Sequence, residues 1–376
     1  MAHAYTPGLR VTPETIIRKS RLLPIPGEVF VSTGQPVDAA TEVARTALPG
    51  RVYPVNVANQ LGIAPGDLPS YMLKREGDAV QKGEPIAENR PFIKWFQTQV
   101  RAPISGVLES ISTVTGQVFL REPPTLIHLP AYIEGTVVEV IPPHGVVVES
   151  HCAFIQGIFG VGGEAGGVIA VAVSGPDEVL TADHLRAEHQ GCIVVGGALV
   201  RPDAFTRARE IGVQAFIVGG VHDRDLKELL GFELGVAITG TERIGLTLII
   251  TEGFGGIPMA RRTFDLLAAK AGQRASCNGA TQIRAGVIRP EVIIPLGRSG
   301  DAPRPTPHAK PEGGIQVGNM IRIIREPYFG LLARVKALPP ELQRIPTESA
   351  VRVLVATLPE GRDVVIPRAN VEMIEE

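Results

Sequence analysis

The sequence is poor in aromatic residues and has no excess of charge of either sign. Only 5% of its 376 residues are aromatic, and 37 Lys and Arg stand against 39 Asp and Glu. A net charge this close to zero excludes a protein that coats nucleic acid or a membrane surface by bulk electrostatics. No run of about 18 apolar residues occurs, so we expect no membrane-spanning helix.

Cysteine is also scarce. Cys152, Cys192 and Cys277 lie far apart and form no C-x-x-C pair, which argues against a disulfide framework, a zinc site or an iron–sulfur cluster. The histidines of the middle region show no paired spacing, so we expect no metal site. We expect the three cysteines to be small buried thiols. The first 22 residues lack the apolar core of a signal peptide, and we therefore expect a cytoplasmic protein.

Glycine and proline, in contrast, are abundant, at 42 and 32 residues. They favour tight turns and short strands over long helical bundles. At about 100–200 residues per domain, a chain of this length contains several domains. The predicted fold class is mixed β and α/β. Composition divides the chain into an N-terminal arm, a β-rich region, an α/β domain, a Pro/Gly-rich linker and a second β-rich domain, at residues 1–22, 23–175, 176–296, 297–312 and 313–376.

The first β-rich region contains a weak internal repeat. One copy covers residues 27–37 and 42–44, and a second covers residues 71–88, in which Gly-Asp and Lys-Gly pairs stand at 77–78 and 82–83. Residues 100–118 continue the alternation of apolar residues. The Gly-Asp and Lys-Gly pairs make tight turns, because Gly accepts positive φ and Asp bonds its own backbone. Over roughly residues 23–122 the pattern resembles a biotinyl/lipoyl-type barrel-sandwich hybrid, most like that of the RnfC family of the Rnf complex. The resemblance implies a small β domain of that fold.

Barrel-sandwich hybrids of the biotinyl/lipoyl type can carry a swinging cofactor on a lysine at a hairpin tip. Lys94 lies in the corresponding interval. Its neighbours are the bulky residues Phe92, Ile93, Trp95 and Phe96, whereas such carriers show Asp-Lys-Ala or Met-Lys-Met. We therefore expect Lys94 to be unmodified and assign no cofactor. Electron transfer is not expected either, because the cysteine run that would bind iron–sulfur clusters is missing.

The middle region alternates apolar strands with amphipathic helices. Repeated strand–helix order predicts a parallel, Rossmann-like α/β domain. Pro258 is expected in the first turn of its helix, where it costs no hydrogen bond. The predicted strands span residues 192–195, 214–218, 235–238 and 246–250, and the predicted helices span residues 201–212, 223–230 and 258–271.

In such sheets, ligands bind beyond the carboxyl ends of the strands. Here those ends carry Gly and Thr, whose small size would admit a ligand close to the backbone, unless the glycines serve only tight turns. The loop 253–256 before a helix is the best candidate for anion binding, and the polar run 276–286 could face the same cleft. The candidate ligand-binding residues are Gly196, Gly197, Gly219, Gly220, Thr239, Gly240, Thr251, Glu252, Gly253, Gly255, Gly256 and Arg284.

Residues 317–335 read as a strand, a Pro–Gly turn and a second strand, followed by apolar segments at 351–355, 363–366 and 370–374. This pattern resembles the KOW motif, most like the C-terminal barrel of NusG-type transcription factors. It departs from the motif at Ala333, where Gly is usual. The resemblance implies an SH3-like barrel that docks proteins, ribosomes or RNA. Eight basic against eight acidic residues in this region favour a protein partner over nucleic acid.

Three functions follow from these patterns. The favoured one is a binding or adaptor protein that holds a small anionic ligand at the Gly-rich edge and docks a protein partner through its β modules. One alternative is an enzyme acting there on a phosphorylated or nucleotide-like substrate, with Glu252 and Arg284 as polar groups. Another is a transcription- or translation-associated factor acting through the KOW-like barrel. No catalytic residue can be named, because no nucleophile elbow or Ser/His/Asp set is present.

Overall fold

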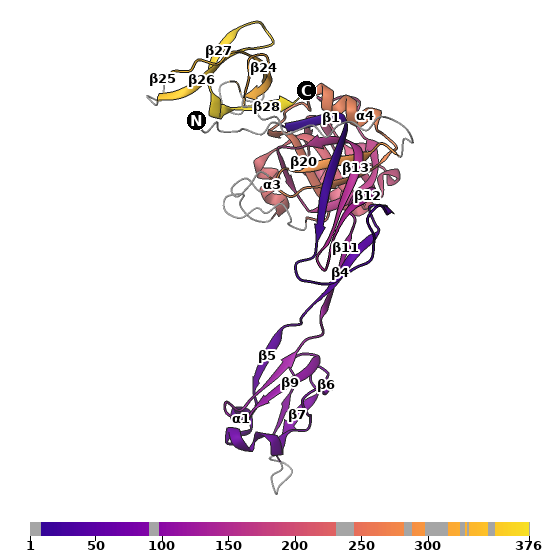
Figure 1. The fold of residues 1–376 in the computed structure, drawn as a ribbon, viewed down its shortest axis with the longest axis vertical. Helices are drawn as coiled ribbons and strands as arrows, with labels where there is room; N and C mark the ends of the chain where they lie inside the picture. Colours follow the sequence, from indigo (N-terminus) through magenta and orange to yellow (C-terminus); the bar gives the residue numbers. More distant parts are fainter. Residues whose placement is uncertain are drawn as a thin grey trace.

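The computed structural model describes residues 9–89, 98–230, 244–281, 288–297, 315–323, 328, 331–344 and 350–375. Over these residues the chain is mostly β, with several sheets and a few short helices. Figure 1 shows an elongated molecule with four parts. They are the head (described residues of 9–41 and 131–297), the stalk (β4 and β11), the distal module (49–124) and the C-terminal module (described residues of 315–375).

The sheet of the head closes on itself. Four strands lie side by side and parallel, in the order β15, β17, β19, β20. From β15 the ladder continues antiparallel through β21 and β22 to β13, and β20 pairs with β14, which follows β13 along the chain. This ring surrounds the largest hydrophobic core. The strands are β13 (Gly145–Gln156), β14 (Phe159–Val161), β15 (Glu164–Val171), β17 (Cys192–Val195), β19 (Ala215–Val221), β20 (Thr247–Phe254), β21 (Arg274–Asn278) and β22 (Glu291–Pro295).

Three helices follow parallel strands: α2 (Pro202–Ile211), α3 (Asp223–Leu230) and α4 (Arg261–Ala269). Helix α2 lies within the predicted range 201–212; it begins with proline and is followed by Gly212, whose φ is 87°. Helix α4 starts three residues after Pro258, because the preceding segment is extended and Met259 N donates to Pro176 O. The predicted strands at 192–195, 214–218 and 246–250 are confirmed. The one predicted at 235–238 lies outside the described residues.

Strand β1 (Leu9–Leu22) differs from the arm expected over residues 1–22. It pairs with β13 along nearly its whole length, apart from an irregularity between Thr12 and Thr15. Arg18 on this strand is exposed, whereas Lys19 and Arg21 are largely covered and pair with Glu291 and Glu164 of the head. The expected boundary at residue 175 also differs, because β15 pairs directly with β17 inside the head sheet. A second core lies under β1 and β13 together with β12 (Gly135–Ile141) and β3 (Pro36–Val37), and the short strands β16 (Val179–Leu180) and β18 (Leu199–Val200) form a parallel pair.

The distal module has its own hydrophobic core, which includes Leu68, Ile86, Leu108 and Leu120. It contains a four-stranded sheet, a two-stranded sheet, helix α1 (Val57–Leu61) and a 3₁₀ segment (Pro65–Tyr71). Lys94 lies outside the described residues. The strands are β5 (Val52–Asn56), β6 (Ala79–Val80), β7 (Pro85–Glu88), β8 (Gln99–Arg101), β9 (Gly106–Ser112) and β10 (Gln117–Arg121).

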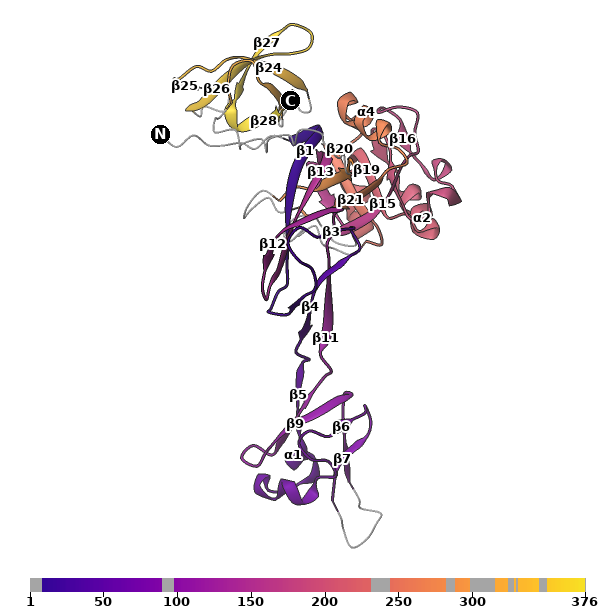
Figure 2. The same ribbon diagram turned by 45° about the vertical axis from the view of Figure 1, so that its right-hand side comes forward.

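The stalk consists of β4 (Glu42–Leu48) and β11 (Thr125–Pro130), joined on the head side by β2 (Glu28–Val29). Figure 2 shows it as a thin connection between the head and the distal module. At its far end Arg121 Nη1 donates to Gly50 O at 3.0 Å, so the two segments of the chain stay bonded where they enter the distal module. Hydrogen bonds from Arg45 and then His128 lower the pKa of Glu42 to about 2, which keeps this carboxylate charged on the stalk.

The C-terminal module is an antiparallel sheet in the order β28, β23, β24, β26, β27, with β25 also on β26. Ala333 is buried in its core. The start of β1 runs parallel to β28, so one strand belongs to the sheets of both the module and the head. The strands are β23 (Met320–Ile323), β24 (Leu332–Ala337), β25 (Leu342–Arg344), β26 (Ala350–Thr357), β27 (Asp363–Pro367) and β28 (Val371–Glu375).

Among the described residues, no helix has the length and apolar character needed to cross a membrane.

Candidate functional site

Three of the glycines predicted to admit a ligand lie against the protein's own backbone, and a fourth lies against apolar side chains. A Cβ atom at Gly219 would stand 2.2 Å from Ile257 O, and one at Gly220 would stand 2.0 Å from Gly255 O. At Gly197 the obstacle is Glu178 O, at 2.3 Å, and at Gly196 it is a set of apolar side chains at 3.0–3.1 Å. These four glycines therefore allow segments of the chain to pack closely, and the space beside them is already filled.

The other residues predicted at this edge have different surroundings. Gly255 and Gly256 face open space, and Gly255 has a φ of 109° that favours glycine. Gly253 continues β20 opposite Gly220. Thr251 is buried and its hydroxyl donates to Val218 O at 3.3 Å. Three further predicted residues, Thr239, Gly240 and Arg284, lie outside the described residues.

Glu252 holds the C-terminal module against the head. Its Oε2 lies 3.2 Å from Arg322 Nη2, and its Oε1 accepts a bond from Ala260 N, just before α4. Arg322 Nη1 also donates to the carbonyl oxygens of Thr251 (3.1 Å) and Glu252 (3.4 Å). The side chains of Glu252 and Arg322 are only 8% and 7% exposed. The sequence predicts Glu252 as a ligand-binding group. Its carboxylate instead forms a buried contact between modules.

A pocket of about 390 Å³ opens at the same carboxyl edge of the sheet. Arg201 follows β18 and His222 follows β19, so the pocket lies between the starts of α2 and α3. Helix starts carry partial positive charge, and two arginines add to it, whereas two aspartates oppose it. The sequence predicts these positions as helix starts, but nothing in their residue types sets them apart from ordinary exposed ones. The lining residues are Arg201, Pro202, His222, Asp223, Arg224 and Asp225.

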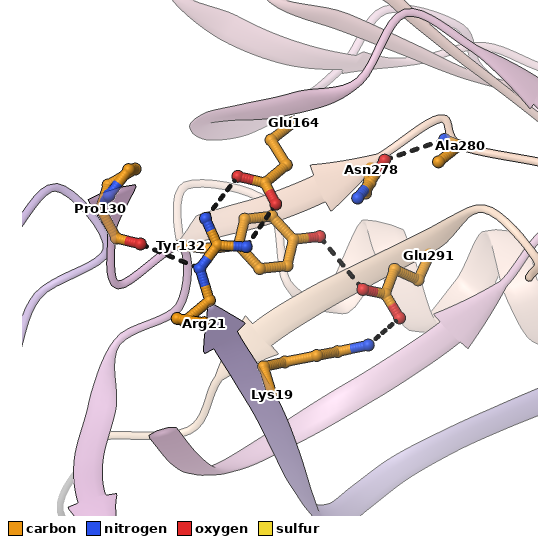
Figure 3. A network of polar contacts seen from close by, with 8 residues as sticks. All are labelled: Lys19, Arg21, Pro130, Tyr132, Glu164, Asn278, Ala280 and Glu291. Carbon is orange, nitrogen blue, oxygen red and sulfur yellow. Dashed lines mark hydrogen bonds and ion pairs between the residues drawn. The ribbon is translucent and has the colours of Figure 1, made fainter. Parts of the chain in front are cut away.

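A second polar cluster lies on the opposite part of the ring (Figure 3). Glu164, Asn278 and Glu291 are directly opposite one another on β15, β21 and β22. Cross-strand partners in antiparallel pairs share one face of the sheet, so the three side chains form a row. Lys19 Nζ reaches Glu291 Oε2 at 2.5 Å, and the hydroxyl of Tyr132 donates to Glu291 Oε1 at 3.3 Å.

Arg21 completes this cluster. Its terminal nitrogens bond both oxygens of Glu164, at 2.5 and 2.9 Å, its Nε donates to Pro130 O, and its guanidinium lies over the ring of Tyr132. Tyr132 has a φ of 71° and, among the described residues, is alone in having positive φ without being glycine. That conformation is costly and persists only where surrounding contacts enforce it. Burial and the charge of Glu291 raise the pKa of Tyr132 well above its usual value, so it remains a neutral donor.

The charges in this cluster balance, two cations against two carboxylates, so its evident role is to fix β1 on the face of the sheet. Of its members, only Asn278 lies in a segment that the sequence singles out, the polar run 276–286. That run is expected to face the Gly-rich edge, whereas Asn278 lies opposite Glu164, at the start of β15. Lys19 and Arg21 read as part of an N-terminal basic run, and Glu164 as part of a Gly-rich turn. No local pattern connects segments so distant in the sequence.

A scan against protein-family models and a search of curated proteins both give no match for this chain. The two family resemblances therefore depend on the residue patterns alone.

The thiols are poorly suited to nucleophilic chemistry. Burial raises the pKa of Cys152 and of Cys277 to about 12, with the charge of Glu291 adding to the effect at both. Burial also raises the pKa of Cys192, which is partly exposed. The expectation of buried thiols is met by Cys152 and Cys277. Among the described residues no group of three potential metal ligands is present.

The alkylation pattern of the native protein should follow these environments. A thiol reacts as its thiolate, and a thiol whose pKa is raised stays protonated until the pH approaches that value. At pH 8 we expect iodoacetamide to modify Cys192 slowly and to leave Cys152 and Cys277 untouched for hours. In denaturant all three should react. Peptide mass spectrometry measures this, and rapid native labelling of Cys277 would contradict the assigned burial.

Proposed function

We propose that this protein is a binding or adaptor protein that presents a small β module to a protein partner at the end of a stalk. The observation that carries the proposal is the stalk itself. Strands β4 and β11 leave the head together, and the chain between them builds a module with its own core. Figure 2 shows that module standing apart from the head. A module held this way keeps most of its surface available for a partner.

The finer fold assignments are part of the same proposal. Two small sheets over one core and turns with positive φ at Gly77 and Gly83 support a barrel-sandwich hybrid in the distal module. The antiparallel order of β28, β23, β24, β26 and β27 supports an SH3-like, KOW-type barrel. Four parallel strands with intervening helices support a Rossmann-like element within the head. Small β domains of these kinds are well suited to docking.

The proposal also includes a small anionic ligand in the head, placed in the pocket between α2 and α3. Arg201 and Arg224 line that pocket beside two helix starts, and ligands of α/β sheets gather at this edge. The ligand has a different position from the one inferred from glycine, since the chain itself fills the space beside Gly196, Gly197, Gly219 and Gly220. Acidic residues in the lining would select for ligands that also offer hydrogen-bond donors.

Site-specific photo-crosslinking in the source cells tests the adaptor role. A photoreactive amino acid at Val114, which is 86% exposed on the distal module, should give a discrete covalent adduct with a partner protein. The same residue at Val179, exposed on the head, is the matched control. Denaturing gels and mass spectrometry detect the adducts. The proposal fails if Val114 and the second distal position, Val107, give no adduct or only the adducts obtained from Val179.

A further inference from the structure

A groove of about 650 Å³ crosses the C-terminal module along β24. Its lining is mainly apolar. Met320 on β23 and Leu332 on β24 are partly exposed, and Pro359 after β26 is exposed; Val335 and Leu358, which also line it, belong to the buried core of the module. A volume of this size accommodates several side chains of a bound segment. All these residues belong to one module, so the groove does not depend on how the module is placed on the head.

Exposed apolar side chains extend this surface beyond the groove. Leu331, immediately before β24, is 42% exposed, and Val317 is 62% exposed. Val317 lies near the later part of β24, because its neighbour Gly318 donates a backbone bond to Val335 O at 2.8 Å. Single exposed apolar residues are common, but a groove with such residues near both ends of one strand is typical of a protein interaction site.

The charges around the groove indicate what kind of partner it fits. Arg334 and Lys336 line it, and no acidic residue does among the described residues of its wall. Both residues belong to β24, where they alternate with the buried residues Ala333 and Val335. Arg334 bonds Gly318 O at 2.8 Å, and Lys336 bonds Asp363 at 2.5 Å on the neighbouring surface, so both cationic groups are held in place. A partner that fills the groove therefore brings its flanking groups beside the guanidinium of Arg334 and beside Lys336, whose ammonium it would share with Asp363.

We infer that this groove docks a segment of another protein that combines apolar side chains with Asp or Glu. The apolar residues fill the groove and supply most of the favourable free energy, and the carboxylates pair with Arg334 and Lys336 and set the preference over basic segments. This site is separate from the distal module. Either docking surface can therefore fail without the other, and the two experiments distinguish the two failures.

Fluorescence anisotropy with the full-length protein tests the inference. The probe is a fluorescein-labelled ten-residue peptide alternating Leu and Glu. The controls are peptides alternating Leu with Lys and Ser with Glu. We expect the Leu/Glu peptide to bind at least tenfold more tightly than either control, and its binding to weaken as salt is raised. Equal binding of the Leu/Glu and Leu/Lys peptides, or no binding of the Leu/Glu peptide, overturns the inference.

Two variants locate the binding. Leu332→Asp should weaken binding of the Leu/Glu peptide at least tenfold. Val365→Asp, on an exposed residue of the same module outside the groove, should leave that binding unchanged. If Leu332→Asp unfolds the module, the exposed substitution Lys336→Glu still tests the site, because it should reverse the preference between the Glu and Lys peptides. Equal loss in Val365→Asp and Leu332→Asp would place the peptide elsewhere.

Discussion

Replacing Glu252 by Ala is expected to lower the stability of the docked C-terminal module by about 3–5 kcal/mol, the usual cost of breaking a buried ion pair by removing one partner. The guanidinium of Arg322 would remain buried without its carboxylate, and Ala260 N before α4 would lose its acceptor. Arg322 Nε already has no hydrogen-bond partner in the structure, so the site has little capacity to compensate. The effect is measured by denaturant unfolding in which the hydrogen exchange of β23 and β28 is monitored.

Glu210→Ala is the matched control for this substitution. It removes the ion pair between Arg207 and Glu210 on α2, whose side chains are both largely exposed, and should cost less than about 1 kcal/mol. Arg322→Met removes the other partner and leaves the buried carboxylate of Glu252 without its cation, so it should cost a similar amount. Equal effects of Glu252→Ala and Glu210→Ala would show that the buried pair does not hold the module.

Gly220→Ala is expected to destabilise the head by about 2–3 kcal/mol, since inserting atoms into a filled site forces the backbone to shift. The added Cβ would lie 2.0 Å from Gly255 O and 3.1 Å from two further carbonyl oxygens, those of Ala198 and Gly253. A flexible side chain could move aside, but three backbone carbonyls of adjacent strands and loops cannot do so cheaply. Thermal and denaturant unfolding of the purified variant measure the loss.

Gly256→Ala separates this explanation from a ligand-binding role. Gly256 has open space around its missing side chain and no positive φ, so the substitution should change the free energy of unfolding by less than about 0.5 kcal/mol. If glycines at the strand ends existed to admit a ligand, both variants would unfold like the parent protein. A Gly220→Ala variant as stable as Gly256→Ala would support that ligand-binding role.

Local patterns in the sequence predicted individual elements of the head well. Apolar runs that end in small residues located β17, β19 and β20, and the amphipathic pattern located α2. They did not predict the return of the sheet through β21, β22 and β13, because that closure depends on pairing between segments far apart in the chain. Strand β1 was missed for a similar reason: its partner β13 lies more than a hundred residues away.

The candidate site shows a different limit. The sequence points to the carboxyl edge of the parallel strands, and the structure has a polar pocket there. Ligand binding at this edge stays a prediction. The residues that line this pocket are not the glycines predicted from the sequence. A glycine can make room for a ligand or for another segment of backbone, and the sequence does not distinguish the two. Gly219 and Gly220 serve the second use. The pocket instead takes its polar groups from the first residues of α2 and α3, whose types are also ordinary at exposed helix starts.

The pairing of β1 with β28 also constrains how the protein is made. Leu9 and Arg10 lie beside Ile374 and Glu375, yet the ribosome releases β1 long before it synthesises β28. Until then the beginning of β1 presents an unpaired strand edge, to which another nascent chain can add. The pairing of β1 with β28 can therefore form only after β28 has been translated. A stop codon ahead of Val371 would leave the edge of β1 unpaired in every chain. Chains that end before β28 should accordingly associate through this edge more readily than the full-length protein.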